Sequence, residues 1–219
     1  GGDAHHVASL SLSIAATERD TGKTQRLDQR LSVDAQPSGG FEQWHFSSRE
    51  LELPPGVAQA RVVVRDDSLG RLGSLTLRFV VPELSGLRFS TPILTDRLAK
   101  GKPGAAPLPV LLVRREFPPK DVLYCQYQVF GAAMPPGVGP RVEASYELRR
   151  RDGATVRKGT ASVIAPGADG TLVRMLGLPL EGMEEGDYEM VLRIQDKVTG
   201  ETRERVEPLR LSAKAGASG

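Results

Sequence analysis

A cluster of five basic residues is the feature of this sequence best suited to binding a ligand. Two alternating segments meet at Asp152-Gly153, a dipeptide that favours a two-residue β-hairpin turn. Such a hairpin would gather five cations able to bind an acidic glycan, a phosphate or an anionic surface. The alternative, which we favour, needs no ligand, because arginines on a hairpin edge also discourage edge-to-edge pairing of strands. The five residues are Arg149, Arg150, Arg151, Arg157 and Lys158.

Acidic residues gather in two similar turns and at one corner. A calcium site needs six to eight oxygen ligands, and the turn sequences DDSLG and DKVTG offer too few. We therefore interpret Asp66 and Asp196 as acceptors of backbone hydrogen bonds, with Gly70 and Gly200 at positive φ. We interpret the acidic corner as solvated surface, and we predict no metal site and no cofactor. The corner comprises Glu181, Glu184, Glu185 and Asp187.

Candidate nucleophiles and bases are few. The three histidines are His5, His6 and His45, and the first two, being adjacent on an extended chain, would point apart. The only cysteine, Cys125, alternates with apolar residues, so we expect it to be buried rather than reactive. No Ser/His/Asp set and no G-x-S-x-G elbow is visible. These observations predict that the chain is not an enzyme.

The elements that position these residues include a stretch that occurs twice. A shift of 186 − 56 = 130 residues places Gly186–Leu211 beneath Gly56–Val81 without a gap. Three turn and corner residues of the first copy, Gly56, Asp66 and Gly70, fall on Gly186, Asp196 and Gly200. The apolar phase also matches, since Val62 and Val64 fall on Leu192 and Ile194. Each copy predicts an antiparallel hairpin with these apolar residues facing inward.

The rest of the chain repeats the same pattern of short alternating segments. No segment has a helical period, and strands recur about every 8–12 residues. We predict an all-β chain of two tandem immunoglobulin/fibronectin-III-like antiparallel β-sandwiches. The first would span residues 1–96 and the second 110–213, followed by a flexible tail at 214–219. The stretch LAKGKPGAAPLP marks a linker at 97–109, because its small residues leave little to pack.

Composition excludes several classes of partner. The chain has 219 residues, of which 39% are hydrophobic and 26% charged, with a net charge of +2. Residues 1–95 carry ten Lys or Arg and eleven Asp or Glu, so the charge is spread evenly and predicts no nucleic-acid partner. No apolar run approaches the ~20 residues of a transmembrane helix.

The second copy of the repeated stretch also carries an aromatic corner signal. Gly186-Asp187-Tyr188 follows an apolar strand and a glycine turn, which resembles the tyrosine corner of immunoglobulin-like sandwiches. There the phenol bonds back to the corner backbone. Ala58 stands at the matching position of the first copy.

Several short motifs of the first half resemble a known family. They are Leu51-Glu-Leu-Pro-Pro-Gly56, Arg61-Val-Val-Val-Arg-Asp66, Gly70-Arg71-Leu72-Gly73-Ser74 and Val81-Pro82-Glu83-Leu84. This series is similar to the C-terminal tail region of VWFA-related proteins of acidobacterial type, without their von Willebrand factor A-like domain. Such proteins are typically exported, so the resemblance implies an extracytoplasmic location: periplasmic, cell-surface or secreted.

The expected function follows from this fold and this resemblance. We expect a non-catalytic module of an exported or surface protein, acting as a spacer or protein-interaction unit. Its partners would be another protein or other domains of the same larger protein. The alternative is a carbohydrate- or anion-binding module that uses the Arg149–Lys158 hairpin and the loops Gly131–Pro140 and Pro166–Gly170.

Overall fold

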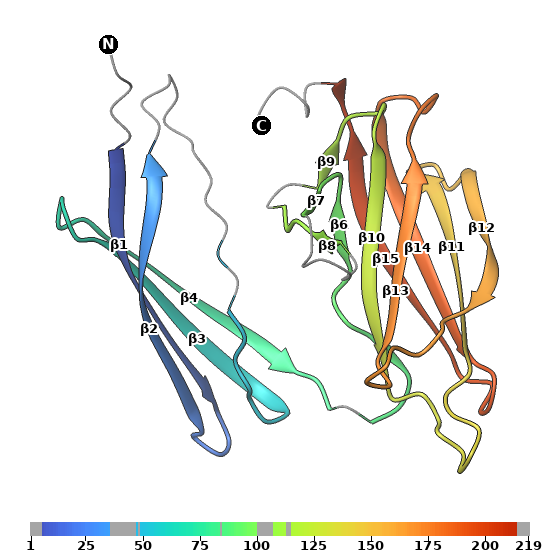
Figure 1. Cartoon of the computed structure of the whole chain (residues 1–219), viewed down its shortest axis with the longest axis horizontal. Coiled ribbons are helices and arrows are strands. Elements are labelled where there is room, and N and C mark those ends of the chain that lie inside the picture. The colour runs from blue at the N-terminus through green and yellow to red at the C-terminus, as the bar shows by residue number, and fades with distance from the viewer. Residues whose placement is uncertain are drawn as a thin grey trace. The chain divides into compact units, whose positions relative to one another are not determined.

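The structure is a computed structural model that describes residues 6–35, 47, 49–83, 85–99, 107–112 and 115–213. All fifteen elements in this part of the chain are β-strands, which confirms the predicted all-β class. The chain divides into two compact units, residues 1–84 and 85–219 (Figure 1). No helix long and apolar enough to cross a membrane occurs in the described residues.

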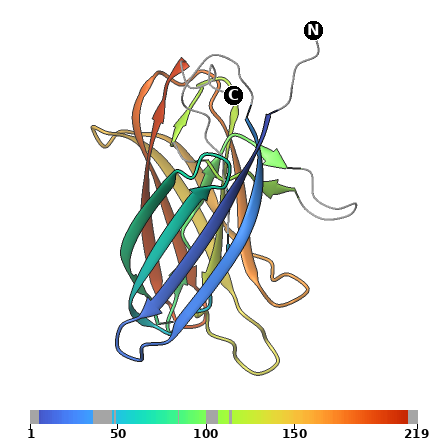
Figure 2. The same cartoon turned by 90° about the vertical axis from the view of Figure 1, so that its left-hand side faces the viewer.

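The first unit contains one antiparallel sheet of four strands in the order β2-β1-β3-β4 (Figure 2, blue to green). The chain alternates apolar and polar residues along each strand, so each strand gives the sheet one apolar and one polar side. Strand β1 lies between its hairpin partner β2 and β3, and β3 turns back into β4. The strands are β1 (His6–Glu18), β2 (Thr24–Ala35), β3 (Gly56–Asp66) and β4 (Leu72–Val81).

The register of the first sheet places most of its apolar residues on one side. Ile14 pairs with Leu27 and with Val62, and Val62 pairs with Leu75, so these four side chains form one row across the sheet. The opposite side carries serines, threonines and arginines of the intervening positions, together with Val57, Val63, Leu72 and Val80. We call the apolar side the apolar face of the first unit. It comprises Leu10, Leu12, Ile14, Ala16, Leu27, Leu31, Ala58, Ala60, Val62, Val64, Leu75, Leu77 and Phe79.

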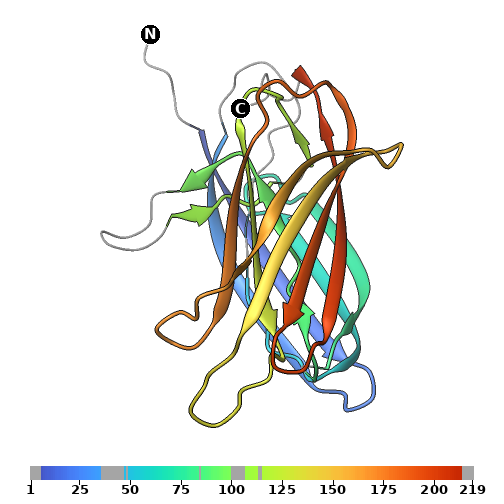
Figure 3. The same cartoon turned by 90° about the vertical axis from the view of Figure 1, so that its right-hand side faces the viewer.

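The second unit is a β-sandwich of two larger sheets (Figure 3 shows β11, β12, β14 and β15 in front, yellow to red). One sheet has the order β12-β11-β14-β15-β9, and only the β15–β9 pair is parallel. The other has the order β13-β10-β5, with β6 also paired to β10, and β7 and β8 form a separate small hairpin. The strands are β5 (Arg88–Phe89), β6 (Ile93–Thr95), β7 (Leu98–Ala99), β8 (Leu108–Pro109), β9 (Glu116–Phe117), β10 (Val122–Phe130), β11 (Val142–Arg150), β12 (Thr155–Val163), β13 (Leu172–Pro179), β14 (Gly186–Asp196) and β15 (Thr202–Leu211).

The core of the second unit lies between its two sheets. From one sheet, β10 contributes Leu123, Cys125 and Tyr127, all fully buried. From the other, β14 contributes Leu192 and Ile194, which are also fully buried. Apolar residues at alternate positions of both sheets therefore remove each other from water, which is the main stabilising contribution of a sandwich.

The repeated stretch forms the same hairpin in both units. Strands β14 and β15 begin and end 130 residues after β3 and β4. Gly56 pairs with Val81 and Gly186 with Leu211, so the register is also the same. Leu192 and Ile194 face the core and Arg193 faces outward, as predicted from the shared apolar phase.

The turn of each hairpin is held by the same aspartate and glycine. Asp66 Oδ1 accepts hydrogen bonds from the backbone N–H groups of Ser68 (2.8 Å) and Leu69 (2.9 Å). Asp196 Oδ1 accepts the equivalent bonds from Val198 (2.8 Å) and Thr199 (3.3 Å). Gly70 and Gly200 have φ of 68° and 77°, a conformation that glycine adopts without steric cost.

The corner glycines that open the two hairpins are also matched. Gly56 has φ of 139° and Gly186 has φ of 149°, a region that residues with a Cβ rarely adopt. A Cβ on Gly56 would also lie 2.7 Å from Glu18 Oε1. Both the positive φ and this close contact therefore require glycine at that corner.

The units differ from the domain limits predicted at 1–96, 97–109 and 110–213. Strands β5 and β6 pair with β10, and Leu87 and Leu94 are buried in the second core, so 85–96 belongs to the second unit. The expected linker begins and ends in paired strands, because Leu98 pairs with Pro109 and Ala99 with Leu108. Both ends of the predicted linker thus belong to the second unit. Residues 100–106 and the predicted tail at 214–219 lie outside the described residues.

The predicted first sandwich also differs from the structure. In the described part of residues 1–84, the chain forms one sheet, with no second sheet across it. The sequence pattern records which side of a strand is apolar, and it does not record whether another sheet covers that side.

Candidate functional site

The predicted basic hairpin forms as β11, β12 and their turn, and its cations meet carboxylates. Arg149 donates two hydrogen bonds to Glu147 Oε2, at 2.9 Å from Nε and 2.6 Å from Nη2. These bonds hold the pKa of Glu147 below its ordinary value. Lys158 lies opposite Glu147 in the β11–β12 ladder. The outer part of the cluster is therefore already paired within the hairpin.

The remaining arginines of the hairpin meet the acidic corner. Arg150 forms an ion pair with Glu184, whose charge raises the pKa of the guanidinium. Arg151 Nη1 lies 3.4 Å from Asp187 Oδ2, and Arg157 donates a 2.9 Å hydrogen bond to the Glu181 carbonyl. The two clusters that we interpreted separately from the sequence are thus joined by two ion pairs, Arg150–Glu184 and Arg151–Asp187.

The sequence contains one signal for this pairing. Tyr188 is the third residue of β14, and its neighbour in the β11–β14 register is Arg150. A tyrosine corner fixed at this point places the residues just before it beside the end of β11. The residues are 24–36 positions apart in the chain, so composition alone does not show the contact.

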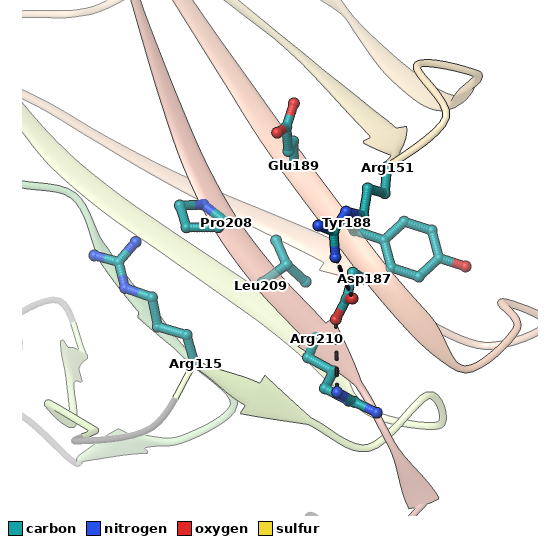
Figure 4. Close-up of a pocket in the computed structure, with 8 residues that line it drawn as sticks. All are labelled: Arg115, Arg151, Asp187, Tyr188, Glu189, Pro208, Leu209 and Arg210. Atoms are coloured by element: carbon teal, nitrogen blue, oxygen red, sulfur yellow. Dashed lines mark hydrogen bonds and ion pairs between the residues drawn. The ribbon is translucent and has the colours of Figure 1, made fainter.

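A surface hollow of about 530 Å³ lies beside this ion-paired corner (Figure 4). Asp187 lies between two guanidiniums, 3.4 Å from Arg151 and 3.8 Å from Arg210. Arg115 forms an ion pair with Glu207, which also pairs with Arg205 at 2.6 Å. The hollow therefore offers cations that already have carboxylate partners. Its lining residues are Arg115, Arg151, Asp187, Tyr188, Glu189, Pro208, Leu209 and Arg210, which include no Ser, Cys, His or Lys.

The corner residue Tyr188 makes the bond expected of a tyrosine corner. Its buried phenol donates a 2.8 Å hydrogen bond to the carbonyl of Glu184. In the first unit the matching pair across the ladder is Glu18 and Ala58. There the buried Glu18 carboxylate accepts hydrogen bonds from Thr21 Oγ1 (2.6 Å), Thr21 N (2.7 Å) and Asp20 N (2.9 Å). The Thr21 hydroxyl contributes most to lowering the Glu18 pKa.

The aspartates of the repeated turns act as structural acceptors, as predicted. Besides its turn bonds, Asp196 accepts a 2.7 Å hydrogen bond from Ala133 N through Oδ2. Burial alone would raise the pKa of Asp196, but its backbone hydrogen bonds, that from Ala133 foremost, lower it overall. The Asp67 carboxylate accepts hydrogen bonds from two hydroxyls on β1, those of Ser11 (2.8 Å) and Ser9 (3.2 Å). Within the described residues, no group of three or more His, Cys, Asp or Glu side chains could hold a metal ion.

The single thiol is buried, as the alternation predicts. Cys125 lies in the core of the second unit, where burial raises the pKa of the thiol to about 12. A thiol with such a pKa stays protonated at neutral pH and reacts slowly. His5, His45 and the side chain of His6 lie outside what the structure describes. The absence of enzymatic activity remains a prediction.

The apolar face of the first unit is a candidate surface that the sequence interpretation missed. Leu75, Leu77 and Phe79 on β4 are 56%, 49% and 39% exposed. At the position matching Phe79 in the second unit, Leu209 is only 4% exposed. Residue type gave no signal of this difference, because the first copy has Leu75 and Leu77 where the second has Arg205 and Glu207.

Comparison with known proteins adds no further constraint. No protein-family model matches the chain, and no curated protein matches it.

Proposed function

We propose that the chain is a non-catalytic protein-interaction module, and that its contact surface is the apolar face of the first unit. The observation that carries this proposal is the exposure of Leu75, Leu77 and Phe79 on a sheet whose counterpart in the second unit is covered. Contiguous apolar surface on a folded protein is typical of interaction sites, contacts with other polypeptides among them.

The second unit supports the same function as a scaffold. It is a complete sandwich with a continuous core, and its corner is fixed by the Tyr188 bond to Glu184. That bond favours an immunoglobulin-like arrangement. Similarity of the Leu51–Leu84 motifs to VWFA-related tails favours an extracytoplasmic location for the module.

The alternative of an anion- or carbohydrate-binding hairpin has less support. Arg149, Arg150 and Arg151 each have a carboxylate partner. An anion would have to displace these carboxylates, and their loss would leave Glu147, Glu184 and Asp187 without their cations. For this reason we place the interaction on the apolar face.

Site-specific photo-crosslinking tests the proposal. A photoreactive phenylalanine analogue at Leu77 lies on the apolar face, and the same analogue at Arg78 lies on the opposite side of the same strand. We expect adducts with another polypeptide chain from position 77 and none from position 78, and we expect Leu75→Glu to abolish them. Adducts confined to the same chain, or equal adducts from both positions, would contradict the proposed contact surface.

A further inference from the structure

Two buried polar groups of the second unit have hydrogen-bonding capacity that the described residues leave unused. Tyr127 on β10 is 1% exposed, and its phenol oxygen has no hydrogen-bond partner among these residues. Arg174 on β13 has a buried Nε that likewise has no partner there. The two residues lie opposite each other in the β10–β13 ladder, so both side chains leave the same side of the sheet. Buried polar atoms are nearly always satisfied in folded proteins, so two neighbouring exceptions indicate a binding site.

Both side chains face the interior of the sandwich. Tyr127 belongs to the core, where its ring meets Phe89 edge-on with the ring centroids 5.2 Å apart. Arg174 is half-buried and shares its side of β13 with the buried Leu172. Its Nη2 donates a 2.6 Å hydrogen bond to Ser162 Oγ on β12, a strand of the facing sheet. Arg174 therefore links the two sheets at their edge strands.

The positive charge of Arg174 has no carboxylate partner within the described residues. A guanidinium keeps its proton in proteins, so this charge cannot be removed by titration. Taking a charge out of water without a counter-charge is costly. The arginines of the basic hairpin differ in this respect, because Arg149, Arg150 and Arg151 each meet a carboxylate. The interior around Arg174 therefore favours a negative ligand.

Three groups at this point of the interior can donate a hydrogen bond to such a ligand. Arg174 Nε carries a hydrogen in every protonation state that the protein meets. Burial raises the pKa of the Tyr127 phenol, so this hydroxyl also keeps its proton. Ser162 Oγ accepts a bond from Arg174, which leaves its own proton free to donate. Three donors beside a fixed positive charge suit a species that only accepts, whereas a water molecule brings two hydrogens of its own.

We propose that a chloride ion binds between the two sheets of the second unit, held by the Tyr127 hydroxyl, Arg174 Nε and the Ser162 hydroxyl. This inference is independent of the proposed function, which concerns the first unit. Protein interiors are packed with few voids larger than a water molecule, so a monatomic anion suits this place better than phosphate or an organic acid. The bound ion joins β10 and β13 of one sheet to β12 of the other, and it thereby stabilises the sandwich at its edge strands.

Thermal denaturation of the full chain at constant ionic strength, with chloride exchanged for gluconate, tests the proposal. Exposure of the buried Cys125 thiol reports unfolding of the second unit. A ligand that binds only the folded chain raises the Tm as its concentration rises. We expect each tenfold rise in chloride above its Kd to raise the Tm by roughly 3–6 °C. Bromide should replace chloride, whereas gluconate is too large for a packed interior.

Two variants and one control connect the chloride effect to this site. Tyr127→Phe keeps the ring and removes one donor, so it should raise the Kd for chloride about tenfold. Arg174→Met removes the charge and should abolish the chloride dependence of the Tm. Tyr124→Phe is the matched control, because Tyr124 lies on the opposite side of the same strand, and it should behave like the wild type. A purely structural role of Arg174 would instead change the Tm equally at every chloride concentration.

Chloride NMR measures the binding directly, because exchange with an ion held by the protein broadens the signal of the free ion. We expect broadening by the wild type and by Tyr124→Phe, and little or none by Arg174→Met. A Tm that does not depend on chloride would overturn the proposal and assign the place to water. A chloride dependence of the same size in the wild type and in Arg174→Met would also overturn it, because the ion would then bind elsewhere.

Discussion

The hairpins β3–β4 and β14–β15 share a backbone and differ in their surroundings. Both have the same length, register and turn, and both turns are closed by an aspartate and a glycine. Yet β15 is buried at Glu207, Leu209 and Leu211, whereas Leu77, Phe79 and Val81 at the matching positions of β4 are exposed or only half-buried. The backbone conformation is therefore determined by local turn chemistry and alternation. Burial is determined by strands such as β10, which lie elsewhere in the chain.

Core truncation should give the largest difference between the hairpins. Leu192 is fully buried, so Leu192→Ala should lower the free energy of unfolding by about 2–5 kcal/mol. Val62 is only half-buried, so Val62→Ala should cost about 1 kcal/mol. Urea denaturation followed by circular dichroism measures both, and thiol exposure of Cys125 reports unfolding of the second unit. Equal losses of stability in the two variants would contradict the conclusion that Leu192 is more deeply buried than Val62.

The two turn aspartates should give the second largest difference in stability between the hairpins. Asp196→Ala leaves the partly buried N–H of Ala133 without its acceptor and should cost about 1–2 kcal/mol. Asp66→Ala removes only exposed turn bonds and should cost less. Paired urea denaturations at neutral pH check this order.

The pH dependence of the Asp196 effect has a defined sign. The pKa of Asp196 is lower in the folded chain, so its stabilisation is complete above the ordinary Asp value of about 4 and is lost as pH falls through the folded value. The difference in stability between wild type and Asp196→Ala should therefore shrink on acidification below about pH 4. A difference that stays constant down to pH 2 would contradict the lowered pKa.

The tyrosine corner is present only in the second hairpin and should contribute a moderate amount. Tyr188→Phe keeps the ring and removes the bond to the Glu184 carbonyl, so we expect a loss of about 0.5–1.5 kcal/mol. Thermal denaturation with Ala58→Ser as a matched polar change in the first unit provides the comparison. No loss in Tyr188→Phe would mean that the corner is held by packing alone.

The outward arginines should give the smallest effects in both hairpins. Arg193 pairs with Glu204 at 2.7 Å, but both side chains are about half exposed. Arg193→Ala should therefore change stability by no more than about 0.5 kcal/mol, as should Arg61→Ala on the exposed side of β3. A loss of more than about 1 kcal/mol at either site would show that these outward arginines contribute substantially to stability.

The sequence was sufficient for features that depend on residues close together in the chain. The turn bonds of Asp66 and Asp196 and the bond of Tyr188 to its corner follow from local patterns, and so does the inward phase of Leu192 and Ile194. It was insufficient where distant segments meet. Strands β5 and β6 have two and three residues, too few for a periodic signal, and only their pairing with β10 assigns them to the second unit.

The same limit applies to the candidate surfaces. The basic hairpin and the acidic corner are each visible in the sequence, but the ion pairs between them depend on the register of β11 against β14. The apolar face shows in the sequence only as an ordinary alternating pattern. Its exposure is a property of the facing layer, and alternation carries no information about that layer.

The shared register of the two hairpins has a consequence for refolding. Each hairpin offers the same ladder geometry, so β14–β15 can pair with β1 and β3–β4 can pair with β11 while the chain is still unfolded. Tandem repeats commonly form such kinetic traps. In this chain the side chains discriminate, because Tyr188 would meet Glu18, and Ala58 would leave a void beside Arg150. The different residues of the two copies at these positions therefore favour the native strand pairs over the exchanged ones.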